Sequence, residues 1–185
     1  MRNFFTLFLV GILFSFCKED VLPKPKAYLN LKYPSVTYQK VLVAKPYSFE
    51  VSSNVELIEQ PKYWRQIRYP KLKATVNITY RPIVNNLKEL LVESEKLVYE
   101  HAVKAEEITT KNFENYEKRV FGSMQEISGN AASQIQFHLT DSTDNFIKGA
   151  LYFYVKPNYD SILPAVAYIK KDIIRLIETL EWENK

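Results

Sequence analysis

The segment from Arg119 to Val155 contains three extended runs that are separated only by short turns, and this spacing limits the possible folds. The turns, 128–130 and 141–145, are built from Ser, Gly, Asn, Asp and Thr, which are mostly residue types that favour turns. A parallel pair of strands needs a crossover of about a dozen residues or more, so runs joined this closely are antiparallel strands. The last run, 147–155, is apolar on both faces, which predicts a central strand that is covered on both sides.

Further strands are predicted upstream. Residues 72–80 alternate between apolar and polar side chains, the pattern of a half-buried strand. Residues 47–51 alternate in the same way, and we expect 55–58 to pair with them across the turn at 52–54. A short extended run, 28–33, precedes them and ends at Pro34.

Two long helices complete the pattern. Residues 83–104 carry one apolar stripe, with Asn86 as the expected N-cap and Glu89 three residues later. Residues 161–181 carry the longer apolar stripe, and an N-cap at Ser161 places Pro164 in the first turn, where its missing N–H costs nothing. The intervening residues 105–118 are polar, and we expect a loop with at most one helical turn there.

This order of elements predicts an α+β fold in which the two main helices, 83–104 and 161–181, pack on an antiparallel sheet of about five to six strands. By analogy, the pattern is compatible with the PsbP/Mog1-like sandwich. The length of 185 residues fits one domain with a short appendage, and 46% apolar with 25% charged residues is typical of a globular chain.

The appendage is the N-terminus. Residues 1–16 have one basic residue followed by an apolar run that is too short to span a bilayer, which is the layout of a secretory signal peptide. The only cysteine, Cys17, stands where this run ends, so we predict that it is acylated as in bacterial lipoproteins. An uncleaved anchor, or cleavage elsewhere with an incidental cysteine, is the alternative. Residues 17–26 then form a lipidated, proline-containing tether, and 27–185 form the single α+β domain.

The sequence gives little support for catalysis. With two histidines and no phosphate-binding glycine loop, we expect no metal and no cofactor. His138, Asp141, Ser142 and Asp144 lie close in sequence, but we interpret the aspartates as turn residues that bind their own backbone rather than as parts of a triad. We therefore expect no enzyme activity and no small-molecule substrate. A net charge of +4 without a dense basic run argues against nucleic-acid binding.

One cluster combines aromatic and basic residues in the way that binding surfaces do. It consists of Tyr63, Trp64, Arg65, Arg68 and Tyr69. Such a cluster serves as an interface anchor, because Trp, Tyr and Arg dominate interface energetics, or it stacks on a sugar ring. The alternative is a strand or loop that covers the sheet.

Two tracts resemble the GldD gliding-motility lipoproteins of the Bacteroidetes. The first is Pro23-Lys24-Pro25-Lys26-Ala27-Tyr28-Leu29-Asn30-Leu31-Lys32-Tyr33-Pro34. The second runs from Leu139-Thr140-Asp141-Ser142-Thr143 through Gly149-Ala150-Leu151-Tyr152-Phe153 and Pro157-Asn158-Tyr159-Asp160-Ser161 to Lys171-Asp172-Ile173. Ala27, where we expect Gly, and Phe16, where lipoproteins usually have a small residue before the cysteine, depart from the pattern.

The resemblance implies a lipid-anchored component of the gliding motility and type IX secretion apparatus, with other envelope proteins as its partners and no catalytic residues to transfer. We expect it to be exposed to the periplasm or the cell surface, with the outer membrane as the favoured anchor. The alternative is an envelope lipoprotein that binds peptidoglycan or another glycan. Ser142 and Ser161 also fit the short O-glycosylation pattern of that phylum, although both double as turn or cap positions.

Overall fold

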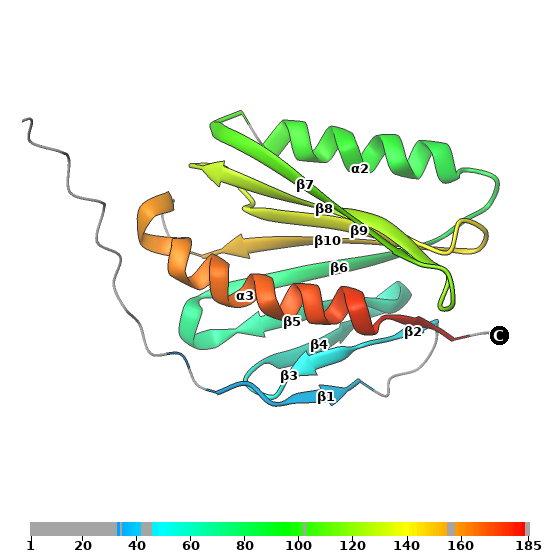
Figure 1. The fold of residues 1–185 in the computed structure, drawn as a ribbon, viewed down its shortest axis with the longest axis horizontal. Helices are drawn as coiled ribbons and strands as arrows, with labels where there is room; N and C mark the ends of the chain where they lie inside the picture. The colour runs from blue at the N-terminus through cyan, green and yellow to red at the C-terminus, as the bar shows by residue number, and fades with distance from the viewer. Residues whose placement is uncertain (1–32, 34, 42–45, 102, 155–157, 184–185) are drawn as a thin grey trace, which may run out of the picture.

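The computed structural model describes residue 33 and residues 35–41, 46–101, 103–154 and 158–183. Cys17, the signal peptide, the tether and most of the expected strand at 28–33 lie outside these residues. The fold is α+β, as predicted, with two helices and a large antiparallel sheet. Figure 1 shows how these elements are arranged.

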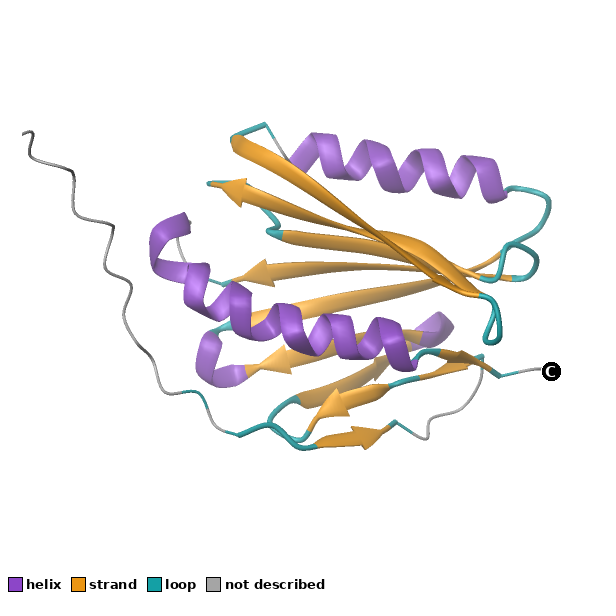
Figure 2. Cartoon of the chain, viewed as in Figure 1, coloured by secondary structure: helices purple, strands orange, loops and turns teal. Residues whose placement is uncertain are grey.

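The large sheet has seven strands in the order β4-β5-β6-β10-β9-β8-β7, and every neighbouring pair is antiparallel. Two small two-stranded sheets, β1-β3 and β11-β2, lie beside it (Figure 2). The strands are β1 (Tyr38–Lys40), β2 (Tyr47–Ser48), β3 (Glu50–Ser52), β4 (Glu56–Gln60), β5 (Trp64–Tyr69), β6 (Ala74–Pro82), β7 (Ala105–Asn115), β8 (Val120–Gly129), β9 (Ile135–Thr140), β10 (Asn145–Phe153) and β11 (Glu181–Trp182). Short 3-10 turns, η1 (Pro61–Tyr63) and η2 (Pro70–Leu72), flank β5.

Helix α3 (Tyr159–Thr179) supplies most of the core. Its buried stripe, Ile162, Val166, Ile169, Ile173, Leu176 and Ile177, packs with inward-facing residues of β5, β6, β8, β9 and β10 and of the small strands β2 and β3. The helix begins two residues earlier than expected, with Asn158 and not Ser161 at the N-cap position, so Pro164 lies inside the helix. Trp182 follows it in β11, paired with Tyr47 of β2, and its indole N–H donates to the Arg119 carbonyl at 3.0 Å.

Helix α2 (Leu87–His101) lies on the opposite face of the sheet. Val98 of α2 packs with Ile127 of β8, whereas Met124 of the same strand belongs to the core beneath α3. Residues 124 and 127 point to opposite faces because side chains alternate along a strand. Glu93 of α2 also forms ion pairs with Arg81 of β6 and with Lys148 of β10.

Two expectations about the strands were wrong. Residues 105–118 are not a loop, because β7 runs through Ala105–Asn115 at the edge of the sheet. From Glu106 to Asn112 every residue is exposed. Because neither face of this stretch is buried, its sequence does not alternate between apolar and polar residues. In addition, β4 pairs with β5 and not with the segment at 47–51, because β3 pairs with β1 instead.

The turn between β9 and β10 shows how one side chain fixes a connection. Asp141 Oδ1 accepts hydrogen bonds from the backbone N–H groups of Thr143, Asp144 and Asn145 at 2.8–3.0 Å, and Oδ2 accepts one from the Asn145 side chain. Burial alone would raise the pKa of Asp141, but these donors outweigh it and hold the pKa below its usual value. Asp141 is therefore the capping turn residue that the sequence predicts.

We expect Asp141→Ala to lower the free energy of unfolding by about 1–3 kcal/mol, because it leaves three backbone N–H groups of the turn without their acceptor. Asp144→Ala, in the same turn, should change it by less than about 0.5 kcal/mol. Urea unfolding of the full-length chain in detergent measures both. The stabilising contribution of Asp141 is present above the pKa of an unfolded aspartate and lost as the pH falls through the lower folded pKa. Equal effects of the two substitutions would contradict this role.

Candidate functional site

The aromatic–basic cluster predicted at 63–69 is divided by the alternation of β5. Ile67 and Tyr69 belong to the core under α3. Trp64, Gln66 and Arg68 therefore point to the opposite face of the sheet, whereas Arg65 points into the core. Tyr63, in η1 at the sheet edge, is 51% exposed. The structure thus brings Trp64 and Arg68 to one face and separates them from Arg65 and Tyr69.

Arg65 is a core residue, only 2% exposed. Its guanidinium lies over the ring of Tyr47, 4.4 Å from the ring centroid, in a cation–π contact that is shielded from water. The Tyr47 hydroxyl donates to the Tyr63 carbonyl at 2.8 Å. Arg65 is thus placed to hold β2 against β5 and is not available to a partner.

Tyr69 belongs to a buried polar cluster that the sequence analysis did not identify. Its hydroxyl donates to Asp172 Oδ2 of α3 at 3.1 Å, and the Tyr38 hydroxyl donates to Asp172 Oδ1 at 2.8 Å. Burial raises the pKa of Asp172, and the two hydroxyl donors offset this only in part. Burial and the neighbouring carboxylate raise the pKa of Tyr38 to about 12. In the sequence, this cluster is indicated by Asp172, a carboxylate that stands next to Ile173 within the apolar stripe of α3.

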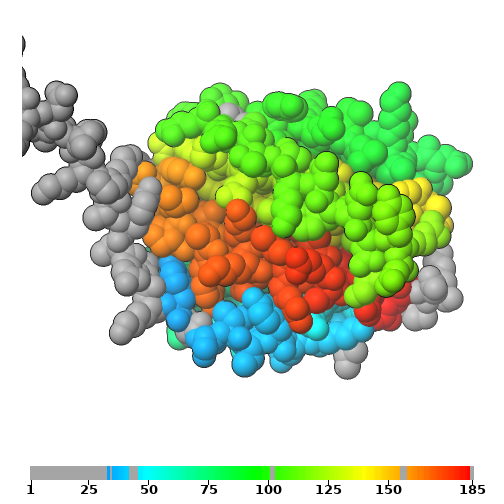
Figure 3. Space-filling view, in the orientation of Figure 1, coloured from blue at the N-terminus to red at the C-terminus, as the bar shows by residue number. Residues whose placement is uncertain are grey.

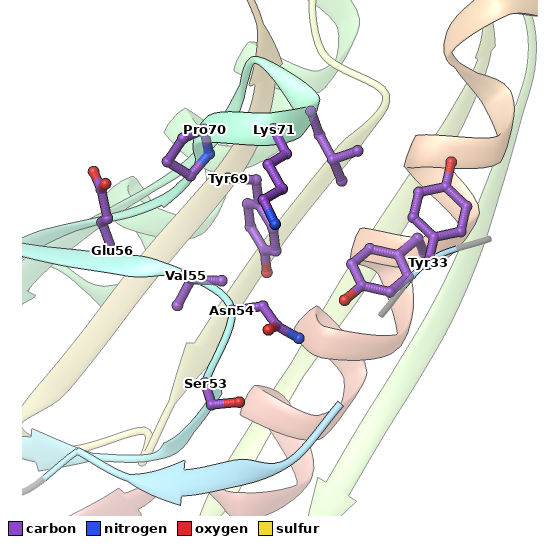
Figure 4. Close-up of a pocket in the computed structure, with 10 residues that line it drawn as sticks. Tyr33, Ser53, Asn54, Val55, Glu56, Tyr69, Pro70 and Lys71 are labelled. Carbon is purple, nitrogen blue, oxygen red and sulfur yellow. The ribbon is translucent and has the colours of Figure 1, made fainter. Parts of the chain in front are cut away.

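A pocket of about 410 Å³ opens beside this cluster, between the β3–β4 turn, η2 and α3 (Figure 4). Its walls combine apolar and aromatic side chains with a few polar ones, and Tyr33 and Tyr168 stack against each other there with ring centroids 4.5 Å apart. The side chains of Asn54 and Lys71 project into the space between the turn and the helix. The volume is that of a small ligand site, but the described groups include no reactive arrangement.

The opposite face of the sheet carries a polar surface, which we call the open face. It consists of Trp64, Gln66 and Arg68 of β5 and Asn77, Thr79 and Arg81 of β6. Within the described part of the chain, α2 is the only helix on this face, and its buried cluster lies over β8. Trp64 is 37% exposed, and its indole N–H donates to the Tyr80 carbonyl at 3.1 Å, which fixes the ring.

A second surface, which we call the α2–β7 flank, combines the outward side of α2 with β7. Val92 and Tyr99, seven residues apart on α2, are 56% and 71% exposed. Val103 in the following turn is 84% exposed, and Ile108 lies on β7. In the space-filling view, α2 and β7 lie next to each other at the surface (Figure 3). This flank therefore joins exposed apolar side chains to an exposed edge strand.

The described residues near His138 do not form a catalytic triad. Asp141 is engaged in its own turn, and the partner of His138 is Ser123 of β8, whose Oγ lies 3.5 Å from Nδ1. Ser123 is 8% exposed and accepts a hydrogen bond from Gln125, and Phe146 stacks on the imidazole. Burial lowers the pKa of His138. Ser123 is buried in this contact, and His138 is half-buried.

Metal and membrane features can be assessed only for the residues that the structure describes. Among them, no group of three or more His, Cys, Asp or Glu side chains is placed to hold a metal ion. No helix within the same ranges has the length and apolarity needed to cross a bilayer.

Both predicted O-glycosylation residues are exposed. Ser142 lies at the tip of the β9–β10 turn with a left-handed backbone (φ 69°), and its N–H donates to Thr140 Oγ1. Ser161 lies in the first turn of α3, where its hydroxyl donates to the Asn158 carbonyl at 2.8 Å. Their modification stays a prediction, and both hydroxyls lie on the surface of the domain.

We expect Arg65→Ala to lower the free energy of unfolding by about 2 kcal/mol or more, since it removes a desolvated cation–π contact and the packing of the aliphatic stem. Arg68→Ala is the matched control on the same strand, because Arg68 is exposed and donates only to Gln66 among the described residues. Its effect should stay within about 0.5 kcal/mol. Thermal unfolding monitored by circular dichroism compares the two, and a reversed order would refute the assignment of Arg65 to the core.

The Asp172 cluster makes stability depend on pH. Because the folded pKa of Asp172 is raised, its contribution to stability is fully present below the pKa of an unfolded aspartate and is lost as the pH rises through the folded pKa. Asp172→Asn removes this dependence. We therefore expect the variant to gain stability relative to the wild type as the pH rises above the pKa of an unfolded aspartate, measured by urea unfolding at a series of pH values. Glu56→Gln, at an exposed position, is the control, and a constant difference between Asp172→Asn and the wild type would contradict the prediction.

Comparison with known proteins supplies the family. Residues 18–182 match the model of the family described as gliding motility lipoprotein GldD. A search of curated proteins finds no match. The match covers nearly all of the chain after the predicted signal peptide. It includes both of the tracts that resemble this family. The chain therefore belongs to the GldD family of gliding motility lipoproteins.

Proposed function

We propose that this lipoprotein is a non-enzymatic component of the gliding motility and type IX secretion apparatus, held at the outer membrane by acylated Cys17. It acts by contact with other envelope proteins. Membership of the GldD family gives the role in gliding motility and a membrane-anchored place in the cell envelope. The connection to secretion, the choice of membrane and the mode of action are our inference.

The observation that carries the contact role is the α2–β7 flank. Protein interfaces are enriched in aromatic residues at their cores, and Tyr99 with Val92 and Val103 supplies such a group on the outward side of α2. Next to it, β7 is an edge strand, so alternate backbone N–H and C=O groups along it face away from β8. Proteins commonly use such edges to add a strand from a partner.

We propose no catalytic step for this protein, because of the way its nucleophilic and acidic side chains are placed. A nucleophile needs a base and room for a substrate, whereas Ser123 is buried and Phe146 stacks on the half-buried His138 ring. The described carboxylates of Asp141 and Asp172 are each occupied by hydrogen bonds to their neighbours. We therefore assign the molecule a binding role.

We expect Cys17→Ser to abolish incorporation of a fatty-acid label and to release the protein from the membrane fraction, since the thiol is the proposed site of acylation. Labelling of cells with an alkyne fatty acid, followed by membrane fractionation, measures both effects. Ser15→Ala, two residues away, is the control and should stay anchored. A labelled and membrane-bound Cys17→Ser protein would exclude lipidation at this residue.

A photo-crosslinking experiment tests the flank. A photoreactive phenylalanine in place of Tyr99 should crosslink to proteins of the gliding and secretion apparatus in intact cells. The matched control is the same substitution at Tyr154, which is 65% exposed and follows β10, a strand separated from β7 by β9 and β8. Crosslinks to apparatus proteins from position 154 and none from position 99 would contradict the proposed contact surface.

A further inference from the structure

Helix α2 is docked on the sheet through very few buried side chains. Among the side chains of α2 that the structure describes, only Leu90, Ser94 and Val98 are buried, at intervals of four residues. One of these three is a serine. Helix α3, by contrast, buries six apolar side chains along its length. Because the burial of apolar surface drives docking, α2 is held on the sheet much more weakly than α3.

The face of the sheet on the α2 side is largely polar. Two adjacent rows of cross-strand neighbours run across this face from β8 to β6. They are Ser123-His138-Lys148-Thr79 and Gln125-Gln136-Ala150-Asn77. Only Ala150 in these rows is apolar. Lys148 places the first row beside α2, because it forms an ion pair with Glu93 of that helix. The sheet therefore offers α2 little apolar surface, apart from Ile127 and Ala131 near Val98.

The N-terminal half of α2 is also incompletely packed. An open cavity of about 210 Å³ is lined by Leu90 and Glu93 of α2 together with Trp64 and Phe146 of the sheet. Well-packed interiors leave few spaces larger than a water molecule. Leu90 therefore gains less from its contact with the sheet than a residue of the closely packed core does.

Polar contacts add little to the docking of α2. The described ion pairs between α2 and the sheet all come from Glu93, which is bound to Arg81 and Lys148 and is 53% exposed. Ion pairs that are this exposed contribute little to stability. On the sheet, Gln125 donates to Ser123 at 2.7 Å, and this hydrogen bond within β8 does not depend on the helix. Removal of α2 from the sheet therefore breaks few strong interactions.

We propose that α2 is a lid that opens from the sheet as a unit while the core under α3 stays folded, and that its opening controls the α2–β7 flank. Val92 and Tyr99 lie on α2, whereas Ile108 lies on β7, so the flank is complete only when α2 is closed. A partner that binds the flank then stabilises the closed state. The control of the flank rests on the contact role proposed above, but the opening of α2 does not.

Native-state hydrogen exchange of the full-length chain in detergent tests the opening. Exchange is followed by mass spectrometry over a series of low urea concentrations. We expect the amides of α2 to exchange at least about a hundredfold faster than the slowest amides of α3, because they exchange by local opening. Their rates should also rise less steeply with urea, since the opening of one helix exposes less surface than global unfolding. Equal rates and equal urea dependence in the two helices would overturn the proposal.

Two substitutions separate local opening from global unfolding. Ile169→Val, in the core under α3, should speed exchange in α3 by about fivefold and leave α2 unchanged, since Ile169 stays buried when α2 opens. Val98→Ala should speed exchange in α2 by about tenfold, because it weakens the contact of the lid with Ile127. Equal acceleration of both helices by Ile169→Val would show that α2 opens only with the whole domain, and would contradict the proposal.

The control of the flank is tested by forcing the lid open. Val98→Asp places a charge at a buried position of α2, so the helix should lose its exchange protection while α3 keeps its own. With a photoreactive phenylalanine at position 99, this variant should give at least about tenfold fewer crosslinks than the same protein with Val98. Undiminished crosslinks from an opened α2 would refute the control of the flank. Absence of crosslinks with Val98 in place would instead count against the contact role, because the exchange measurements need no partner.

Discussion

The burial of β10 on both faces is the constraint on which the rest of the structure depends. This strand lies between β6 and β9 and so joins the two halves of the seven-stranded sheet. Ile147 and Leu151 are fully buried on the side of α3, and Phe146 is buried on the other side. At Gly149 the ring of Phe137 occupies the space of a side chain, since a Cβ there would lie 2.1 Å from Phe137 Cζ. Helix α3 packs on one of these faces, and α2 contacts the strand on the other.

The sequence predicts those parts of the fold in which burial imposes a pattern. The alternation in β6, the two-sided apolar strand β10 and the apolar stripe of α3 were all expected and are all present. The existence of β7 could not be predicted, because an edge strand exposed on both faces has no apolar period to detect. This segment forms a strand because it pairs with β8, and such pairing cannot be detected from the local sequence.

The candidate site was predicted less completely, for a related reason. The cluster at 63–69 was treated as one surface, but a strand divides consecutive residues between two faces. Arg65 is buried under Tyr47, whereas Arg68, three residues later, is exposed. Arg65 shares the face of Ile67 and Tyr69, where Tyr47 of β2, a strand distant in sequence, covers it. The α2–β7 flank was missed because its apolar residues are isolated within polar segments.

The α2–β7 flank and the open face both lie on the α2 side of the sheet. The α2–β7 flank offers apolar side chains and a strand edge, which suits protein contact. The open face carries mainly polar side chains of β5 and β6 instead. The core under α3 is common to both, so damage to either surface should leave the domain folded.

The most direct test of the contact role is a functional assay of a flank variant expressed from its native locus. Tyr99→Glu combined with Val92→Glu places two charges at exposed positions, where the fold tolerates them. Gliding and type IX secretion should both be lost while the protein stays folded, membrane-bound and at normal abundance, and Tyr154→Glu should behave as the wild type. Normal gliding and secretion in the double variant would contradict the proposal that this protein acts through the α2–β7 flank.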